Sequence, residues 1–445
     1  MSHSRRTSFS IVKTDSSPTL SPIIGVESED WISAWKHVYA RDLIDSRIVA
    51  VDAETSVEDA CDTLLTEDIY CLAVRTPSTS PSNSPYMGLF DYSDVNAFLT
   101  LAATRHTISP EELRANPRVD QIVAAAKAGQ VAVQLVSNLS EKNFLETLPY
   151  NADLIALLGV FSRGTHRVLI QCPAPSAGYL GTVSDRRLLS WFSAYANQTP
   201  SFQRYLSNPL SSLSLPSLNM YASVVATIST AYLLDAMKLM SEQGVSSVAV
   251  IDEGLGTLLS AVSVTDIGKI VVPSQSNHIL STPLHQFITQ IKEPDGSMDG
   301  VDKYPVYMVM PSSTLSYTTQ KLLATNAHRL FITNDRPPSP SSVSGSSGSP
   351  CGIVSIVDVL SLFARIANVP DVDPTHRQRR RASSSSSHSS LSAHDLARSR
   401  SSSRTSLRLS ASPRIKPTGI PGDSHRNSIS SLDSFQWAER VPKRE

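Results

Sequence analysis

Two short stretches of this sequence place an aspartate three residues after a serine. Ser263 and Asp266 stand in LLSAVSVTDIGKI, and Ser355 and Asp358 stand in CGIVSIVDVLSLF. In both stretches an apolar run ends at the serine. A carboxylate there can accept hydrogen bonds from the two hydroxyls of a ribose, while the serine hydroxyl and backbone N–H groups face phosphate oxygens. The alternative is purely structural, because an aspartate near a helix N-terminus complements the helix dipole.

Two histidine–arginine pairs offer the cations that a phosphate needs. His166–Arg167 in THRVLI and His328–Arg329 in AHRLFI each open an apolar, β-rich run. Arginine suits this role because it can grip a phosphate through two parallel hydrogen bonds. A single exposed His-Arg pair can also be a solvated strand start, so the recurrence of the pair is what favours a function.

These residues recur at equivalent places in a repeated segment. Each of four segments has a short β-rich run, a helix, an apolar strand, and a further strand that enters a second helix. Aligned on that last strand, the segments place Asp94, Arg187, Asp266 and Asp358 at one position, at intervals of 93, 79 and 92 residues. A unit of about 60 residues buries its small sheet on one face only, so we expect the four units to form two pairs.

The four segments resemble cystathionine-β-synthase (CBS) repeats, two of which form a Bateman module. The resemblance covers roughly residues 31–369, and its closest general likeness is to the gamma regulatory subunit of AMP-activated protein kinase. It is carried by the V-I-D strand end (250–252), the G-h-h-S-x-x-D strand ends, YASVVATISTAYLLDAM (221–237), THRVLI with SDRRLL, and AHRLFI with GIVSIVDVL. It implies an α/β fold of four CBS repeats, paired as two Bateman modules in a disc, with disordered N- and C-terminal tails.

The expected boundaries follow from this layout and from the Ser/Arg-rich composition of the ends. They are a disordered N-terminal tail (1–30), repeat 1 (31–103), repeat 2 (118–197), a linker (198–217), repeat 3 (218–274), repeat 4 (300–370) and a disordered C-terminal tail (371–445).

The resemblance also implies a ligand site. In the CBS family the S/T-x-x-D motif binds the ribose of adenosine, and the H-R pairs face phosphates. Carried over by position, the candidates for binding AMP, ADP or ATP as a regulatory ligand are Asp94, His166, Arg167, Ser263, Asp266, His328, Arg329, Ser355 and Asp358. No cofactor is expected to be required.

Two repeats depart from this pattern. Repeat 1 has Asp91 where a serine or threonine is expected, and repeat 2 has Arg187 in place of the acid. Repeats 1 and 3 also lack the basic residue before the apolar strand. At most three sites are therefore expected, and a weakened or altered nucleotide site remains an open alternative.

The Ser/Pro loops at 76–85 and 336–350 and the Ser/Arg-rich tail resemble the fungal Sds/Moc-type proteins. Those are free-standing four-CBS regulators linked to inhibition of PP2A-type phosphatases, cell-cycle progression, cell separation and stress or nutrient response. The resemblance implies a regulator whose partner is a PP2A-type phosphatase or its own regulator. The alternative is an adenine-nucleotide-sensing, gamma-like subunit of a Snf-type protein kinase.

Composition and the absence of known motifs in the sequence reduce the classes of function to be considered. The four cysteines are scattered and there is no paired His, so neither a disulfide framework nor a metal site is expected. We find no nucleophile motif and no phosphate-binding glycine loop, so an enzyme is not expected. No signal peptide or membrane-spanning run is present in the sequence, which favours a cytoplasmic and nuclear protein without membrane partners.

The tails carry arginine-directed serines. Ser8, Ser383, Ser406 and Ser428 follow arginine by two or three residues, the arrangement that basophilic kinases recognise. Phosphorylation would add nearly two negative charges per site. The alternative is a tail that only aids solubility. From residue 371 onward there are 14 Lys/Arg against 7 Asp/Glu, but the rest is acidic and the tail lacks interleaved aromatics, which argues against a nucleic-acid partner.

Overall fold

The computed structural model describes residues 23–78, 80, 84–176, 178–215, 224–272, 277–292, 308–333 and 350–374. The expected phosphorylation sites Ser8, Ser383, Ser406 and Ser428 lie outside the described residues, as does most of both expected tails. Among the helices of these ranges, none is both long enough and apolar enough to cross a bilayer.

Each repeat is built on a unit of three strands, with one helical segment after the first strand and another after the third. Repeat 1 has β1 (Ala50–Val51), α2 (Val57–Thr66), β2 (Cys71–Arg75), β3 (Tyr86–Asp91) and α3 (Tyr92–Thr104). Repeat 2 has β4 (Thr147–Pro149), α7 (Leu154–Phe161), β5 (Arg167–Gln171), β6 (Tyr179–Ser184) and α8 (Asp185–Gln198). Repeat 3 has β7 (Ala226–Ile228), α10 (Leu233–Gln243), β8 (Ser247–Ile251), β9 (Leu258–Ser263), α11 (Val264–Asp266) and the π-helical turn η5 (Ile267–Val271). Repeat 4 has β10 (Met308–Val309), α13 (Leu315–Ala324), β11 (Arg329–Thr333), β12 (Pro350–Ser355) and α14 (Ile356–Ile366).

The remaining elements precede or connect the repeats. They are α1 (Ile23–Trp35), η1 (Ala40–Leu43), η2 (Arg105–Thr107), α4 (Pro110–Ala115), α5 (Pro117–Ala128), α6 (Val133–Val136), α9 (Pro200–Leu206), η3 (Leu210–Ser212), η6 (Asn277–Ser281) and α12 (Leu284–Lys292).

The four sheets have the same topology. In each, the first strand pairs parallel with the second, and the second pairs antiparallel with the third. Each antiparallel pair has a register irregularity at the same place, for example between Val74 and Arg75 in repeat 1 and between Val250 and Ile251 in repeat 3. The mixed α/β fold of four equivalent units expected from the sequence is therefore confirmed.

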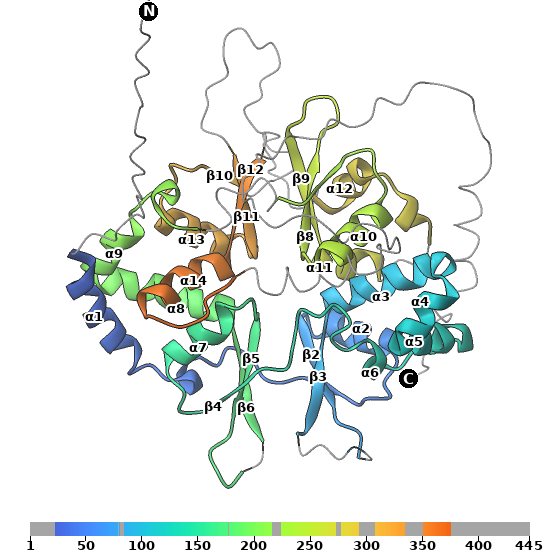
Figure 1. Ribbon diagram of the computed structural model, residues 1–445, viewed down its shortest axis with the longest axis horizontal. Coiled ribbons are helices and arrows are strands. Elements are labelled where there is room, and N and C mark those ends of the chain that lie inside the picture. Colours follow the sequence, from blue (N-terminus) through green and yellow to red (C-terminus); the bar gives the residue numbers. More distant parts are fainter. Residues whose placement is uncertain are drawn as a thin grey trace, which may run out of the picture.

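The sheets meet in two pairs. Ala73 and Leu89 of repeat 1 pack with Leu169 of repeat 2, while Ala249 and Leu258 of repeat 3 pack with Phe331 of repeat 4. These contacts join repeats that are consecutive in the chain, as expected for two Bateman modules. In Figure 1 the four sheets gather near the middle of the molecule and the helices lie on its two flanks.

The helices join the two modules crosswise. One apolar core combines buried residues of repeats 1 and 3, and the other combines those of repeats 2 and 4. Helix α3 packs against α10, and α14 packs against α7. Because sheets link 1 with 2 and 3 with 4, the four repeats form a ring around a common centre (Figure 1).

The N-terminal helix corrects one expectation. Residues 23–30, expected within a disordered tail, form the start of α1. The helix is anchored by Trp31 and Trp35, which are 1 % and 0 % exposed in the core of repeats 2 and 4. The ring of Trp35 meets that of Phe192 edge to face with centroids 5.0 Å apart. This docking could not be predicted from the local sequence, because the residues that contact the two tryptophans lie far along the chain.

Two connecting segments also differ from the expected boundaries. Residues from 118 were expected in repeat 2, but Ile122, Val133 and Val136 of α5 and α6 are buried in the core of repeats 1 and 3. The expected linker 198–217 includes α9, whose Phe202 is fully buried in the other core. Both segments carry large apolar side chains, and burying them stabilises a helix against the core.

Candidate functional site

A cavity of about 590 Å³ lies where the four repeats meet. One structural position of each repeat faces it: the residue directly before the middle strand, which is Tyr70, His166, Ser246 or His328. In repeats 2, 3 and 4 the carbonyl of this residue accepts a hydrogen bond, at 2.9–3.1 Å, from the first N–H of the helix that follows the third strand of the same repeat. The fold thus directs four equivalent positions toward one centre.

The two halves of the cavity differ in chemistry. The next residue, the first of the middle strand, is Arg167 in repeat 2 and Arg329 in repeat 4, but Cys71 in repeat 1 and Ser247 in repeat 3. Repeats 2 and 4 therefore contribute imidazole and guanidinium groups, and repeats 1 and 3 contribute smaller polar groups and a tyrosine. The two arginines would attract an anionic ligand on the side of repeats 2 and 4, except close to the carboxylate of Asp185, which lines the same side.

The structure brings together six of the nine nucleotide-binding candidates. The cavity lining includes His166, Arg167, Ser263, Asp266, His328 and Arg329. Asp94, Ser355 and Asp358 are not part of that lining. The three of them therefore need separate consideration.

Both S-x-x-D motifs form capping boxes with matching geometry. Asp266 Oδ2 accepts the Ser263 N–H at 2.9 Å and the Ser263 hydroxyl at 2.8 Å. Asp358 Oδ2 accepts the same two groups of Ser355 at 2.8 and 2.7 Å. The serine hydroxyls in turn accept the aspartate N–H groups at 3.2 Å. The structural alternative for these residues is thus present, and only the Ser263–Asp266 pair also faces the cavity.

The Asp94 carboxylate is already hydrogen-bonded by another segment of the same chain. It is fully buried, and its carboxylate accepts the backbone N–H groups of Asn138 at 3.1 Å and Ser140 at 2.8 Å. Asp91 caps the same helix and accepts a hydrogen bond from the Asn143 side chain. The segment 138–143 therefore covers the strand end of repeat 1.

These two carboxyl groups also influence each other. Burial raises the pKa of Asp91 and of Asp94, and the charge of Asp91 raises that of Asp94 further. Two carboxyl groups at the strand end of repeat 1 would oppose the approach of a phosphate there.

Repeat 2 is covered in a similar way by residues before β1. Ser46 pairs with Thr182 through a backbone bridge and a 2.6 Å contact between hydroxyls, and Ser184 donates a hydrogen bond to Asp45. Gly181 permits this approach, because a Cβ there would lie 2.6 Å from Ile44 Cγ2 and 2.9 Å from the Ser46 carbonyl.

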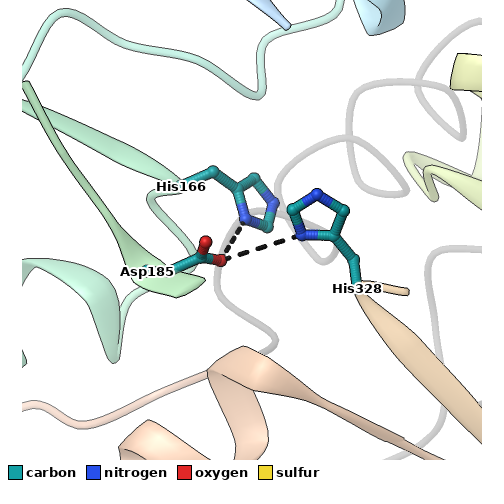
Figure 2. A group of neighbouring side chains, drawn as sticks. All are labelled: His166, Asp185 and His328. Atoms are coloured by element: carbon teal, nitrogen blue, oxygen red, sulfur yellow. Dashed lines mark hydrogen bonds and ion pairs between the residues drawn. The ribbon is translucent and has the colours of Figure 1, made fainter. Parts of the chain in front are cut away.

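A residue that the sequence did not single out links the two histidines. Figure 2 shows Asp185, the first residue of α8, beside His166 and His328. Asp185 Oδ2 lies 2.8 Å from His166 Nδ1 and 4.0 Å from His328 Nδ1. The two imidazole rings meet edge to face with centroids 5.3 Å apart. The cluster joins repeats 2 and 4 at the cavity wall.

Burial sets the charges of this cluster. Burial raises the pKa of Asp185, but His166, His328 and Arg167 outweigh it, and the pKa lies below its ordinary value. Burial also lowers the pKa of His328 to about 3. At neutral pH the cluster therefore contains an ionised carboxylate and at least one neutral imidazole.

Several polar atoms of the cavity wall lack a hydrogen-bond partner among the described residues. They are Arg186 Nη2, Ser247 Oγ, Ser260 Oγ, His328 Nδ1 and Arg329 Nε. Buried polar atoms are normally paired, because leaving one unpaired costs about 1–3 kcal/mol. Their concentration around one cavity is typical of a site that binds a polar ligand. Sequence reasoning missed Arg186 and the two serines, although aligning the repeats on the middle strand would have indicated Ser247.

Comparison with known proteins identifies relatives over most of the chain. No family model matches it. Over 312 residues, 69 % of this chain, it is 32 % identical to Protein sds23 of Neosartorya fischeri and 33 % identical to that of Aspergillus clavatus. Over 320 residues it is 29 % identical to Protein SDS23 of Saccharomyces cerevisiae. The aligned region spans 55 %, 57 % and 58 % of the lengths of these three relatives.

Solved structures share the fold. A Methanocaldococcus jannaschii protein described as a proposed archaeal homologue of g-AMPK is similar over 73 % of this chain and 100 % of its own, with a TM-score of 0.50 and 16 % identity. At this identity the likeness concerns the fold alone.

Proposed function

We propose that this chain is a non-enzymatic regulatory protein controlled by an adenine nucleotide in its central cavity. Its similarity to fungal Sds23 proteins and its fold of four paired α/β repeats support this proposal. One observation carries this proposal. Candidate residues from repeats 2, 3 and 4, far apart in the chain, line a single cavity. Its volume of about 590 Å³ lies within the range of small-molecule sites.

The chemistry of the wall suggests an orientation. Asp266 at the repeat 3 side would accept hydrogen bonds from ribose hydroxyls, while Arg167 and Arg329 would meet the phosphates. Arg329 already donates a 2.9 Å hydrogen bond to Ser246, so it connects repeats 3 and 4 beside the site. A ligand that contacts several repeats would favour one arrangement of the two modules and so alter a docking surface.

Calorimetry with AMP, ADP and ATP tests the nucleotide proposal. Asp266→Asn should weaken binding by at least about tenfold, since hydrogen bonds to charged groups contribute about 1.5–3 kcal/mol. Asp235→Asn is the matched control, because Asp235 also closes a helix capping box but is not part of the cavity lining. Asp94→Asn and Asp358→Asn test the other two candidates in the same assay. Equal nucleotide affinity in wild type and Asp266→Asn, or no binding at all, contradicts the proposal.

We further propose that the regulated partner is a PP2A-type phosphatase or its regulator, and that the chain inhibits it during cell-cycle progression, cell separation and stress or nutrient response. Homology to Sds23 proteins and the Ser/Pro loop layout support this assignment. Basophilic kinases acting on the tails would modify the docking, in the cytoplasm and nucleus. Purified full-length chain should lower phosphatase activity in a dose-dependent manner, and no change in activity with no co-precipitation excludes this partner.

The His-Arg pairs at the cavity favour a second candidate, a gamma-like subunit of a Snf-type kinase. In that case the chain would co-purify with the kinase rather than the phosphatase, and AMP would change the amount recovered. Mass spectrometry of the captured proteins, with and without nucleotide, distinguishes the two partners.

A further inference from the structure

We propose that His166, Asp185 and His328 form a binding site for a divalent transition-metal ion, with Zn²⁺ as the ion that the ligand set fits. Two imidazoles and one carboxylate are a common zinc ligand set that leaves one coordination position open. The sequence argument expected no metal, because the cysteines are scattered and no paired histidines occur. Because the three ligands come from two repeats, no local sequence motif predicts the site.

The geometry is close to what zinc requires. The ligand atoms all lie within 4.8 Å of one another. Bonds of about 2.0–2.1 Å in a tetrahedral site place neighbouring ligand atoms about 3.3 Å apart. The two distances from Asp185 Oδ2, 2.8 Å to His166 Nδ1 and 4.0 Å to His328 Nδ1, lie on either side of that value. Two atoms bonded to one zinc ion lie at most about 4.2 Å apart, so the histidine rings must also turn toward each other where their nitrogens approach the 4.8 Å limit.

The ligands are also held in place. The Asp185 N–H donates to the His166 carbonyl at 3.1 Å, and Asp185 Oδ1 accepts the Arg186 N–H at 2.7 Å, which leaves Oδ2 directed at the histidines. The His328 carbonyl is held by the Ile356 N–H at 3.1 Å. Outer contacts of this kind orient metal ligands in zinc proteins.

Two features favour a cation over a simple hydrogen-bond network. The His328 Nδ1 atom is buried without a hydrogen-bond partner among the described residues, although it faces the same oxygen as His166. A carboxylate oxygen between two rings would repel an anion at that point, whereas a cation would satisfy all three groups. Three guanidinium groups of the cavity lining, those of Arg167, Arg186 and Arg329, oppose a cation, and the hydrogen bonds of Arg186 to the Leu322 carbonyl and of Arg329 to Ser246 do not remove their charge. The ionised Asp185 carboxylate is the group of the cluster that attracts the ion.

Zinc binding to the full-length, chelator-treated chain tests the proposal with Zn²⁺ alone. Wild type should bind one equivalent that His328→Ala and Asp185→Asn lose or bind at least about tenfold more weakly, since even outer-shell losses cost 10–100-fold. His37→Ala is the matched control, because His37 is an exposed histidine whose Nδ1 lies 2.7 Å from the Ser33 carbonyl, outside the cavity lining. Visible absorption of the Co²⁺-loaded chain should show tetrahedral coordination in wild type and in His37→Ala only.

Circular dichroism separates loss of ligand from loss of fold. If Asp185→Asn unfolds, the His328→Ala variant decides the question, because His328 Nδ1 has no hydrogen-bond partner within the described ranges that the substitution could remove. Unchanged zinc stoichiometry and affinity in a folded His328→Ala chain would overturn the proposal, as would the absence of zinc binding by wild type.

Discussion

Asn326 of repeat 4 donates a 2.8 Å hydrogen bond to the phenolic oxygen of Tyr70 of repeat 1. The same tyrosine ring lies 5.9 Å from the Arg167 guanidinium of repeat 2 and 5.8 Å from the Lys269 ammonium of repeat 3. Tyr70 therefore contacts all three other repeats. It occupies the position that is histidine in repeats 2 and 4, and it connects the ring at the cavity wall.

The first prediction concerns this contact. Tyr70→Phe should lower the free energy of unfolding by about 0.5–1.5 kcal/mol, the net contribution of one hydrogen bond. Asn326→Gly removes the same bond and suits the left-handed backbone of residue 326, whose φ is 54°. In denaturant unfolding the double variant should lose less than the two single losses together, because one interaction is removed twice. Strict additivity would mean that the bond contributes nothing.

Gly268 provides a second prediction. It is the second residue of η5, and a Cβ placed on it would overlap the ring of Tyr92 from repeat 1. Gly268→Ala should therefore destabilise the fold by about 1–3 kcal/mol, as overpacking of a tight contact does. Gly254→Ala is the control, since its Cβ would meet only Asp252 Oδ1 at an ordinary 3.5 Å. Thermal unfolding of the two variants compares them, and equal midpoints would contradict the role of this contact in joining repeats 1 and 3.

The docking of α1 yields a third prediction. Trp35→Ala should cost about 3–5 kcal/mol of unfolding free energy, because it leaves a large cavity among Phe192, Phe202 and Phe363. Trp191→Ala should cost less, since Trp191 is only partly buried and stacks on Tyr195. Hydrogen exchange of α1 should accelerate in the first variant only. Slow exchange there would show that other contacts hold the helix.

The buried pair Asp91 and Asp94 should make the stability of the fold depend on pH. Their pKa values are raised by burial, so the folded chain binds more protons than the unfolded chain above their ordinary value of 3.8, and stability falls as pH rises toward the raised values. Asp91→Ser restores the serine of the repeat 3 and 4 motif and removes the neighbouring charge. The variant should gain more stability relative to wild type at about pH 8 than at about pH 5.

Asp91→Asn is the control for that experiment, because it removes the charge without supplying a hydroxyl. Both variants should show the weaker pH dependence in denaturant unfolding. A slope identical to wild type in Asp91→Ser would mean that the two carboxyl groups do not interact as described.

Local patterns were sufficient to predict the repeats. The Ser263–Asp266 and Ser355–Asp358 motifs lie three residues apart, and the capping boxes they form depend on almost nothing else in the chain. The alternation of short apolar strands with helices is likewise a local property, so the mixed α/β units followed from the sequence. Their pairing through sheets followed from the need of each unit to cover one face.

The site could be predicted only in part. The availability of Asp94 depends on residues 138–143, which approach it from another part of the chain and supply backbone N–H groups. Backbone donors carry no sequence signature, so the motif alone could not reveal that this carboxylate is already bound. Asp185 was missed for a related reason, because its meaning comes from His328 in a different repeat.

The sequence by itself determined the four units, their strand ends and the chemistry each unit could present, because these depend on residues close together in the chain. Only the tertiary structure decided which units face each other, and hence that repeats 2 and 4 bring His166, Asp185 and His328 together while the chain covers Asp94. The physical reason is that these contacts arise from packing of the sheets and helices between repeats. That packing depends on the shapes of whole surfaces rather than on any local spacing.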